Sequence, residues 1–564
     1  MRKLFLALSF ILLSTTSYCA PRSLEQIKAA AAKVLKLKIQ PNRVNALNGK
    51  TNVLNVLKEG NEYTVVGYAD GGFAVIANDD MFDAVIGYSD GQFSQTDMPP
   101  AMVWWMSAMD ESLRKQKESG ITSPRAVSPA DAGYPASVDE LVTSSWGQDT
   151  PFNDQCPTYT YAGKTQRYVT GCVATAMSQI MYFHKYPLQG QGRKIYDFTS
   201  PVDGKQWNFD VRFSRVKYDW DNMIDSYDHG YNALQAEAVA QLMFHCGVSV
   251  NMMYNMDGSG AFTKDAANSL REYFSYSTKM YTRDVFTKNE WMNVIYKEIS
   301  EHCPILYGGS SPTQGGHAFV LDGYDENGLV HINWGWNGSQ DGYFEIGELN
   351  GFTDGQDMIL MHTATDPEIP YSSQLGIMES LTWSNGSTTR GRFTVQLNGT
   401  LLSYTVTNLL NCDSESFAGK LMLMAEPSDG GSAVSLNSFT TSIGPNGGYP
   451  SMSKDNISIR SLSDGTYRLF LASQSDLEST WQPVHSNENI VNNYILTITG
   501  GNATLTAGEA GWTTGIDNVT VNGNTLKPAA DNRIYSIDGR YLGTDVEKLD
   551  RGMYIRNGVK FVKK

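Results

Sequence analysis

Cys172 has the sequence context of a nucleophilic thiol. It follows Gly171 and opens a segment in which mainly apolar residues recur at helical spacing until Tyr186-Pro187. The recurring residues are Val173, Met177, Ile180, Met181 and His184. Cys172 is therefore predicted in the first turn of a buried helix, where the positive end of the helix dipole and free N–H groups stabilise a thiolate. Such a sulfur needs an imidazole nearby, which forms an ion pair with it and later protonates the leaving group.

His317 is the candidate imidazole, because Gly315-Gly316 delivers it to the start of an apolar strand. The next apolar run is His331-Ile332-Asn333-Trp334. Two adjacent strands joined by the intervening turn would bring His317 and Asn333 side by side. An amide that accepts the imidazole proton fixes the tautomer of the ring, and Trp334 would shield that bond from water.

The oxyanion formed by attack on a carbonyl carbon also needs hydrogen-bond donors. The backbone N–H of Cys172 supplies one, and Gln148, in Ser145-Trp146-Gly147-Gln148, is the candidate for a second. Loss of one such donor typically raises the activation barrier by about 3 kcal/mol. The residues together predict acyl-transfer chemistry through a thiolate.

These motifs resemble the streptopain family of papain-like cysteine peptidases, which includes interpain- and periodontain-type enzymes. The resemblance spans roughly residues 20–363, and its segments are Gly72–Ala77, Ala84–Phe93, Gln148, Gly171–Ala176, Gly247–Ala261, Gly316–Phe319, Asn333–Trp336 and Asp341–Phe344. It implies a zymogen with nucleophile Cys172, general acid and base His317, orienting Asn333 and oxyanion donor Gln148. It also implies endopeptidase activity on proteins, with a preference for apolar residues two positions before the cut.

The chain divides into several parts, as its 564 residues predict at roughly 150 residues per domain. Helical spacing over 23–36 and a hairpin over 63–77 indicate an α+β unit before a Lys-, Ser- and Pro-rich stretch. We expect an α+β fold class, with a papain-like catalytic domain, a preceding α+β prodomain and all-β C-terminal modules. The expected parts are a signal peptide (1–19), an inhibitory prodomain (20–114), an activation linker (115–133), the peptidase domain (134–365), a β-sandwich-like module (366–508) and a small β module (509–564).

The two ends of the chain predict export. Arg2 and Lys3 precede a short apolar run and a small-residue exit at Ser17–Cys19, which is typical of a secretory signal peptide; a lipidated Cys19 is the alternative. Residues 534–564 resemble the C-terminal sorting modules of type IX secretion cargo. We expect a secreted or cell-surface protein without stable membrane insertion, because no other segment is long and apolar enough for a membrane helix.

Several other residues receive a structural interpretation. Cys246 and Cys303 are interpreted as core residues, whereas Cys156 is either a free thiol or part of a disulfide. His184, His331 and His362 are interpreted as structural, since no His/Cys/Asp cluster has zinc spacing, so we expect no metal and no cofactor. The Gly87–Gly91 match to a serine-hydrolase elbow lacks the helix that must follow it.

A net charge of −15 argues against a nucleic-acid partner. Three functions are compatible with the residues above. The favoured function is a secreted cysteine endopeptidase, made as a zymogen, whose partners are protein or peptide substrates and its own prodomain as intramolecular inhibitor. The alternatives are a binding or adhesion protein with a catalytically dead papain-like domain, and a transglutaminase-type acyl transferase.

Overall fold

The computed structural model describes most of the chain between residues 20 and 513 and short strands beyond it. The described residues are 20–39, 53–69, 71–119, 125–311, 315–347, 349, 355–370, 372–382, 386–513, 520–521, 524–525, 534–536, 541–543, 552–556 and 559–563. The predicted signal peptide lies outside the described residues. No helix among the described residues is both long and apolar enough to cross a bilayer.

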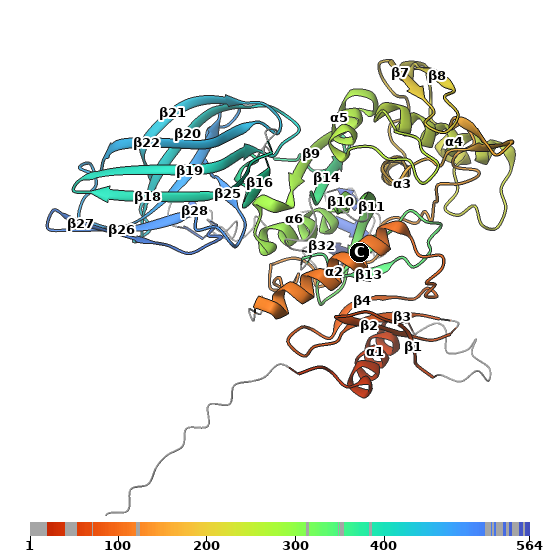
Figure 1. Ribbon diagram of the computed structural model, residues 1–564, viewed down its shortest axis with the longest axis horizontal. Coiled ribbons are helices and arrows are strands. Elements are labelled where there is room, and N and C mark those ends of the chain that lie inside the picture. Colours follow the sequence, from red (N-terminus) through yellow and green to blue (C-terminus); the bar gives the residue numbers. More distant parts are fainter. Residues whose placement is uncertain are drawn as a thin grey trace, which may run out of the picture. The chain divides into compact units, whose positions relative to one another are not determined.

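The first compact unit consists of residues 1–125 together with 339–352. Its elements are α1 (Leu24–Ile39), β1 (Asn55–Glu59), β2 (Tyr63–Gly67), β3 (Phe73–Ala77), β4 (Val85–Ser89), α2 (Pro100–Ser119) and β13 (Gly342–Phe344). The helix α1 begins at a capping box, in which Ser23 N donates to Gln26 Oε1 and Gln26 N donates to Ser23 Oγ. The predicted hairpin is confirmed, because β2 pairs with β3 in antiparallel register. Figure 1 shows α1 packed on this small sheet.

Residues 339–352 group with the prodomain, although the sequence places them inside the peptidase domain 134–365. The strand β13 pairs antiparallel with β4, and the rings of Tyr343 and Tyr88 stack with centroids 5.2 Å apart. The indole of Trp105 donates to the carbonyl of Glu345 at 2.7 Å. Sequence order could not reveal this pairing, because the two strands are about 250 residues apart in the chain and a strand edge accepts any compatible segment.

The predicted linker 115–133 is only partly a linker. Lys115–Ser119 are the last turn of α2, stabilised by the ion pair of Lys117 with Glu62 at 3.2 Å. Residues 120–124 lie outside the described residues. Arg125 pairs with Glu345 at 2.8 Å, and the first unit gives way to the second between residues 125 and 126. The error arose because exposed helical turns and linkers share a polar composition.

The second compact unit begins with a mixed helix and sheet region. Its helices are α3 (Cys172–His184), α4 (Ala233–Ser249), α5 (Thr263–Phe274) and α6 (Lys288–Ser300), with 3-10 turns η1 (Phe213–Arg215), η2 (Trp220–Asn222) and η3 (Arg283–Val285). Its strands are β5 (Thr158–Tyr161), β6 (Lys164–Arg167), β7 (Lys194–Thr199), β8 (Gln206–Val211), β9 (Ser277–Thr282), β10 (Ile305–Ser311), β11 (Gly315–Tyr324), β12 (Val330–Asn333) and β14 (Asp357–His362). The last five form an antiparallel order β12-β11-β10-β14-β9.

The α3 helix packs on one face of this sheet. Ala318 and Val320 of β11 share a core with Val173 and Met177 of α3. Phe319 lies between them in sequence and contacts the ring of Trp334 instead. Side chains alternate between the two faces of a strand, so Ala318 and Val320 define the α3 face of the sheet and Phe319 defines the opposite face.

Residues 375–507 form a sandwich of two sheets that are antiparallel except for the parallel pair of β15 and β25, in agreement with the predicted all-β module (Figure 1). The 5-stranded sheet contains β15 (Leu375–Ile377), β18 (Arg392–Asn398), β19 (Leu401–Asn411), β22 (Gly448–Ser458) and β25 (His485–Ser486). The 6-stranded sheet contains β20 (Phe417–Pro427), β21 (Val434–Ile443), β23 (Gly465–Ser475), β24 (Gln482–Pro483), β26 (Asn493–Thr499) and β27 (Asn502–Ala507). A hairpin of β16 (Ser380–Thr382) and β17 (Thr388–Arg390) lies apart from both sheets. Alternating apolar side chains of the two sheets share one core.

The chain ends in short strands whose backbone alone is described. They are β28 (Thr520–Val521), β29 (Asn524–Thr525), β30 (Ile534–Ser536), β31 (Tyr541–Gly543), β32 (Gly552–Arg556) and β33 (Val559–Lys563). The order β31-β30-β32-β33 is a 4-stranded sheet, consistent with the predicted small β module. The Asp538-Gly539 and Asn557-Gly558 turns lie outside the described residues.

Candidate active site

Cys172 is the first residue of α3, as the sequence predicts. Its neighbour Gly171 has φ 91, and a Cβ there would lie 2.7 Å from the sulfur of Met252 and 2.9 Å from the carbonyl of Ser259. Only glycine fits this position, both for its backbone conformation and for the close approach. The glycine therefore allows the chain to turn after Thr170, so that α3 begins at Cys172.

The Cys172 sulfur lies among backbone N–H donors but in a desolvated setting. Burial raises the pKa of the thiol, while N–H bonds from Ala318, Val173 and Cys172 itself act in the opposite direction. A raised pKa means a protonated thiol at neutral pH, since burial penalises the charged form. The helix terminus alone therefore does not produce a thiolate in this state, and an imidazolium partner is needed.

The backbone N–H of Ala318, the residue after His317, is one of the groups that act against burial on the pKa of the Cys172 thiol. His317 pairs with Gly309 across β11 and β10, next to the pair of Ala318 with Gly308. By the alternation of strand side chains, the His317 side chain leaves β11 on the face opposite to that of Ala318.

Asn333 lies on the α3 face, held by a network that does not run through the imidazole. β12 pairs with β11 as predicted, but the register sets Asn333 opposite Val320, three residues beyond His317. The Asn333 Oδ1 accepts from Gln179 Nε2 at 2.9 Å and from Gly335 N at 3.0 Å. Its Nδ2 donates to the carbonyl of Ser144 at 2.8 Å. The amide is therefore fixed in orientation before the imidazole reaches it.

Gln179 is the site residue that the sequence analysis missed. It is fully buried on α3, seven positions after Cys172 and so on the same helix face. Besides donating to Asn333, its Oε1 accepts from Ser144 Oγ at 3.1 Å and Trp146 N at 3.2 Å. The available signal was a glutamine inside an otherwise apolar helix, since a buried polar side chain needs partners.

Gln148 lies beside the entry to α3 through its backbone. Its carbonyl accepts from Thr170 N at 3.1 Å, two residues before Cys172. The preceding Gly147 packs against Asn337, since a Cβ there would lie 2.3 Å from the Asn337 side-chain oxygen. This packing brings the 146–148 loop and the loop after Asn333 together, and the Gln148 side chain is half-buried beside the nucleophile's helix.

Trp334 is buried and meets Phe319 edge-on, with ring centroids 5.2 Å apart. Because Phe319 and His317 share a face of β11, the indole lies on the same side of this strand as His317. The structure therefore joins Gln148 to the entry of α3 through Thr170 and Asn333 to α3 through Gln179, and it sets His317 and Trp334 on one face of β11.

The other four cysteines of the described chain are buried and free. Burial raises the pKa of Cys156 and of Cys246 to about 12, which makes both thiols inert at neutral pH. Cys246 lies in the α3–α4 core, as the sequence predicts. The disulfide alternative for Cys156 is wrong, because its sulfur has no partner cysteine in the structure.

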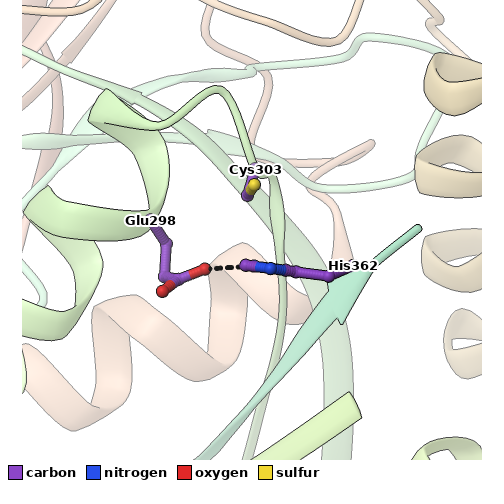
Figure 2. Close-up of side chains that lie close together, drawn as sticks. All are labelled: Glu298, Cys303 and His362. Carbon is purple, nitrogen blue, oxygen red and sulfur yellow. Dashed lines mark hydrogen bonds and ion pairs between the residues drawn. The ribbon is translucent and has the colours of Figure 1, made fainter. Parts of the chain in front are cut away.

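Glu298, Cys303 and His362 form a buried cluster whose donor atoms lie within 4.8 Å of one another (Figure 2). Spacing could not predict it, because His362 is far from Glu298 and Cys303 in the sequence. His362 Nδ1 bonds the carbonyl of Pro367 at 2.7 Å, and its Nε2 bonds Glu298 at 2.6 Å. Both ring nitrogens thus have protein partners, and the cluster acts as an ion pair joining α6 to β14, in line with a structural role for His362.

The Gly87–Gly91 motif is confirmed as structural. Ser89 ends strand β4, is buried, and donates its hydroxyl to the carbonyl of Asp341 at 2.5 Å. No helix follows it directly. A serine hydrolase nucleophile must instead be exposed at a strand-to-helix turn.

Two parts of the chain match known protein families. Residues 146–344 match the Peptidase C10 family, and residues 21–113 match the Spi protease inhibitor family. Streptopain of Streptococcus pyogenes is 30% identical over 318 residues, which cover 53% of this chain and 77% of that protein. The thiol protease/hemagglutinin PrtT of Porphyromonas gingivalis is 32% identical over 293 residues, 50% of this chain but only 33% of PrtT.

A solved structure shows the same relation. The prointerpain A fragment of Prevotella intermedia superposes with a TM-score of 0.50 at 39% sequence identity. The match covers 55% of this chain and 98% of that fragment.

Proposed function

The chain belongs to the Peptidase C10 family, the streptopain family of cysteine peptidases, and from this premise we propose that it is a secreted zymogen of a cysteine endopeptidase. The observation that carries the proposal is the place of Cys172 as the first residue of α3, a helix that shares its core with Ala318, the residue after His317. The same residues in a dead domain would have no reason to keep a complete Cys, His, Asn and Gln set, so a binding or adhesion role is not favoured.

In the active enzyme, His317 takes the proton of Cys172, and the resulting thiolate attacks the peptide carbonyl. The backbone N–H of Cys172 and the amide of Gln148 stabilise the oxyanion. Protonated His317 then delivers its proton to the leaving amine, and water releases the acyl group from sulfur. Asn333, oriented by Gln179, fixes the imidazole tautomer in this step.

Latency follows from the placement of His317. In the zymogen, burial raises the pKa of the Cys172 thiol, so the thiol keeps its proton at neutral pH. We propose that the Spi-type unit at 20–114 maintains this state, and that cleavage within 120–125 allows the 315–317 backbone to turn and bring the imidazole to Cys172. The peptide carbonyl of a protein substrate can be attacked only after that rearrangement.

Residues 1–19 direct export in this proposal, and residues 534–564 act as a sorting module that delivers the chain to the cell exterior. The proposed partners are protein or peptide substrates and the prodomain itself. The β-sandwich is attached to the peptidase region through the buried ion pair of Lys279 with Asp413 and through Gly376 against Val285. It therefore travels with the enzyme after activation.

The test is Cys172→Ala in the full chain, with casein as substrate. We expect casein hydrolysis and self-processing to be abolished, because no other described thiol is positioned to attack. The matched control is Cys412→Ala, which removes a buried thiol in the sandwich and should retain both activities. Casein hydrolysis by the Cys172→Ala protein would refute the proposal, and release of new N-termini distinguishes hydrolysis from acyl transfer to amines.

A further inference from the structure

Asp322 is a buried carboxylate on β11 that the mechanism above does not use. Its side chain has no exposed surface, and each of its two oxygens accepts a hydrogen bond. Val142 N donates to Oδ2 at 2.8 Å, and His331 Nδ1 donates to Oδ1 at 2.6 Å. Burial of a carboxylate is costly unless its oxygens are bonded, and here the two bonds hold it in one orientation. The groups that it binds are therefore held as well.

A β-bulge in β11 sets the direction of this side chain. The register between β11 and β12 shifts between Leu321 and Gly323, so Asp322 is the extra residue of the bulge. A bulge interrupts the regular alternation of a strand and redirects the side chain of the extra residue. The carboxylate thus joins β12, through His331, to a segment that precedes α3, through Val142.

The segment of residues 141–148 is bound to Asp322 at its first two residues. Leu141 N donates to the carbonyl of Asp322 at 3.0 Å, and Val142 N donates to its carboxylate. Both the main chain and the side chain of Asp322 therefore fix the start of the 141–148 segment.

The middle of the 141–148 segment binds the side chains that orient the imidazole in the proposed mechanism. The carbonyl of Ser144 accepts from Asn333 Nδ2 at 2.8 Å. Ser144 Oγ and Trp146 N donate to Gln179 Oε1 at 3.1 Å and 3.2 Å, respectively. Gln179 in turn donates to Asn333 at 2.9 Å. The position of the Asn333 amide therefore depends on the position of this backbone.

Gln148, the proposed oxyanion donor, is the last residue of the 141–148 segment. Its carbonyl accepts from Thr170 N at 3.1 Å, two residues before Cys172. Val142 lies only six positions before Gln148 in the chain. A shift of the backbone at Val142 therefore reaches both the oxyanion donor and the bonds described above.

Asp322 thus anchors the backbone on which both catalytic amides depend. We propose, resting on the function proposed above, that Asp322 is a positioning residue of the peptidase, because it fixes the 141–148 segment on β11. Through this segment it sets the positions of Asn333, which orients His317, and of Gln148, which stabilises the oxyanion. A displacement of about 1 Å in a catalytic group can lower the rate about a hundredfold, so a residue that touches no substrate can control kcat.

Three variants of Asp322 test this role in the full chain. Asp322→Ala and Asp322→Ser remove the acceptor of the Val142 N–H, whereas Asp322→Asn keeps one acceptor oxygen for it. Each protein is activated by immobilised parent enzyme, which is then removed, and kcat and KM are measured on fluorescein-labelled casein. The folded fraction of each preparation is measured by circular dichroism at the assay temperature.

We expect the loss of the acceptor at Asp322 to lower kcat rather than substrate affinity. In Asp322→Ala and Asp322→Ser, kcat should fall about tenfold while KM stays within about twofold, because the displaced groups act in the transition state and not in substrate binding. In Asp322→Asn, kcat should recover to within about threefold of the parent, because a neutral acceptor gives a weaker bond in the same place.

Asp325→Ala is the control for a general loss of stability. Asp325 is also buried, and it accepts from Asn327 N at 2.9 Å and from Leu329 N at 3.0 Å in the turn that follows β11. Its replacement should shift the urea unfolding midpoint by an amount similar to that of Asp322→Ala, but kcat should remain that of the parent.

A kcat of folded Asp322→Ala or Asp322→Ser within about twofold of the parent would overturn the inference. A loss of kcat in Asp325→Ala as large as that in Asp322→Ala would also overturn it, because the effect would then follow from stability alone. Loss of folding in both Asp322→Ala and Asp322→Ser would overturn it too, because Asp322 would then be required for the fold rather than for the site. Failure of the parent to hydrolyse casein would refute the proposed function instead, and it is measured in the same preparation.

Discussion

Replacing Gln179 by Ala tests the network that holds the catalytic amide. The substitution removes three hydrogen bonds, to Asn333, Ser144 and Trp146, at a position with no exposed surface. At about 1 kcal/mol net for each bond, we expect a loss of about 3 kcal/mol in the stability of the peptidase region. For a slope of about 3 kcal/mol per molar urea, this lowers the unfolding midpoint by about 1 M.

The assay is urea unfolding followed by tryptophan fluorescence, in a Cys172→Ala background that prevents autolysis. The control is Ser178→Ala, the adjacent buried residue of α3, whose hydroxyl has no hydrogen-bond partner and whose loss should leave the midpoint near that of the parent. In the active enzyme, Gln179→Glu keeps the acceptor oxygen but sets a carboxylate against Asn333 Oδ1, so kcat should fall further than in Gln179→Ala. A Gln179→Ala midpoint within about 0.2 M of the parent would refute the reasoning.

Two other changes test buried ion pairs. Asp413→Asn removes the carboxylate that forms the buried ion pair with Lys279, and we expect about 3 kcal/mol loss of stability, seen as earlier thermal unfolding and easier proteolysis between peptidase and sandwich. For His362, burial lowers the pKa, but the bonds to Glu298 and to the Pro367 carbonyl outweigh it and leave the pKa raised. The pair therefore stabilises the fold below the unfolded pKa of about 6.5, and this stabilisation is lost as the pH rises through the folded pKa. We therefore expect the difference in melting temperature between the parent and His362→Gln to shrink from pH 6 to pH 9. A gap that is constant or grows would contradict that assignment.

The elements that carry chemistry could be predicted because they depend on local patterns. The helix at Cys172 follows from apolar spacing and from the glycine before it, and the strand at His317 follows from an apolar run. The β-sandwich follows from alternating apolar residues between turns. In each case the signal lies within about ten neighbouring residues, and burial of one face is enough to specify the element.

Two kinds of feature could not be predicted from the sequence: the register between neighbouring strands, and the pairing of segments that are distant in the chain. Asn333 lies opposite Val320 rather than His317, because the strand register is set by the whole hairpin. Likewise, the pairing of residues 339–352 with β4 joins segments that no local pattern connects.

The central claim is that the Cys172 thiol is protonated in the zymogen and becomes an ion-paired thiolate once the prodomain is gone. The rate of Cys172 alkylation by iodoacetamide, measured by mass spectrometry from pH 4 to pH 9 before and after activation, tests it most directly. We expect slow labelling that rises only at high pH in the zymogen, and rapid labelling already near pH 6 in the activated enzyme. Identical profiles before and after activation, or faster labelling at another cysteine, would contradict the claim.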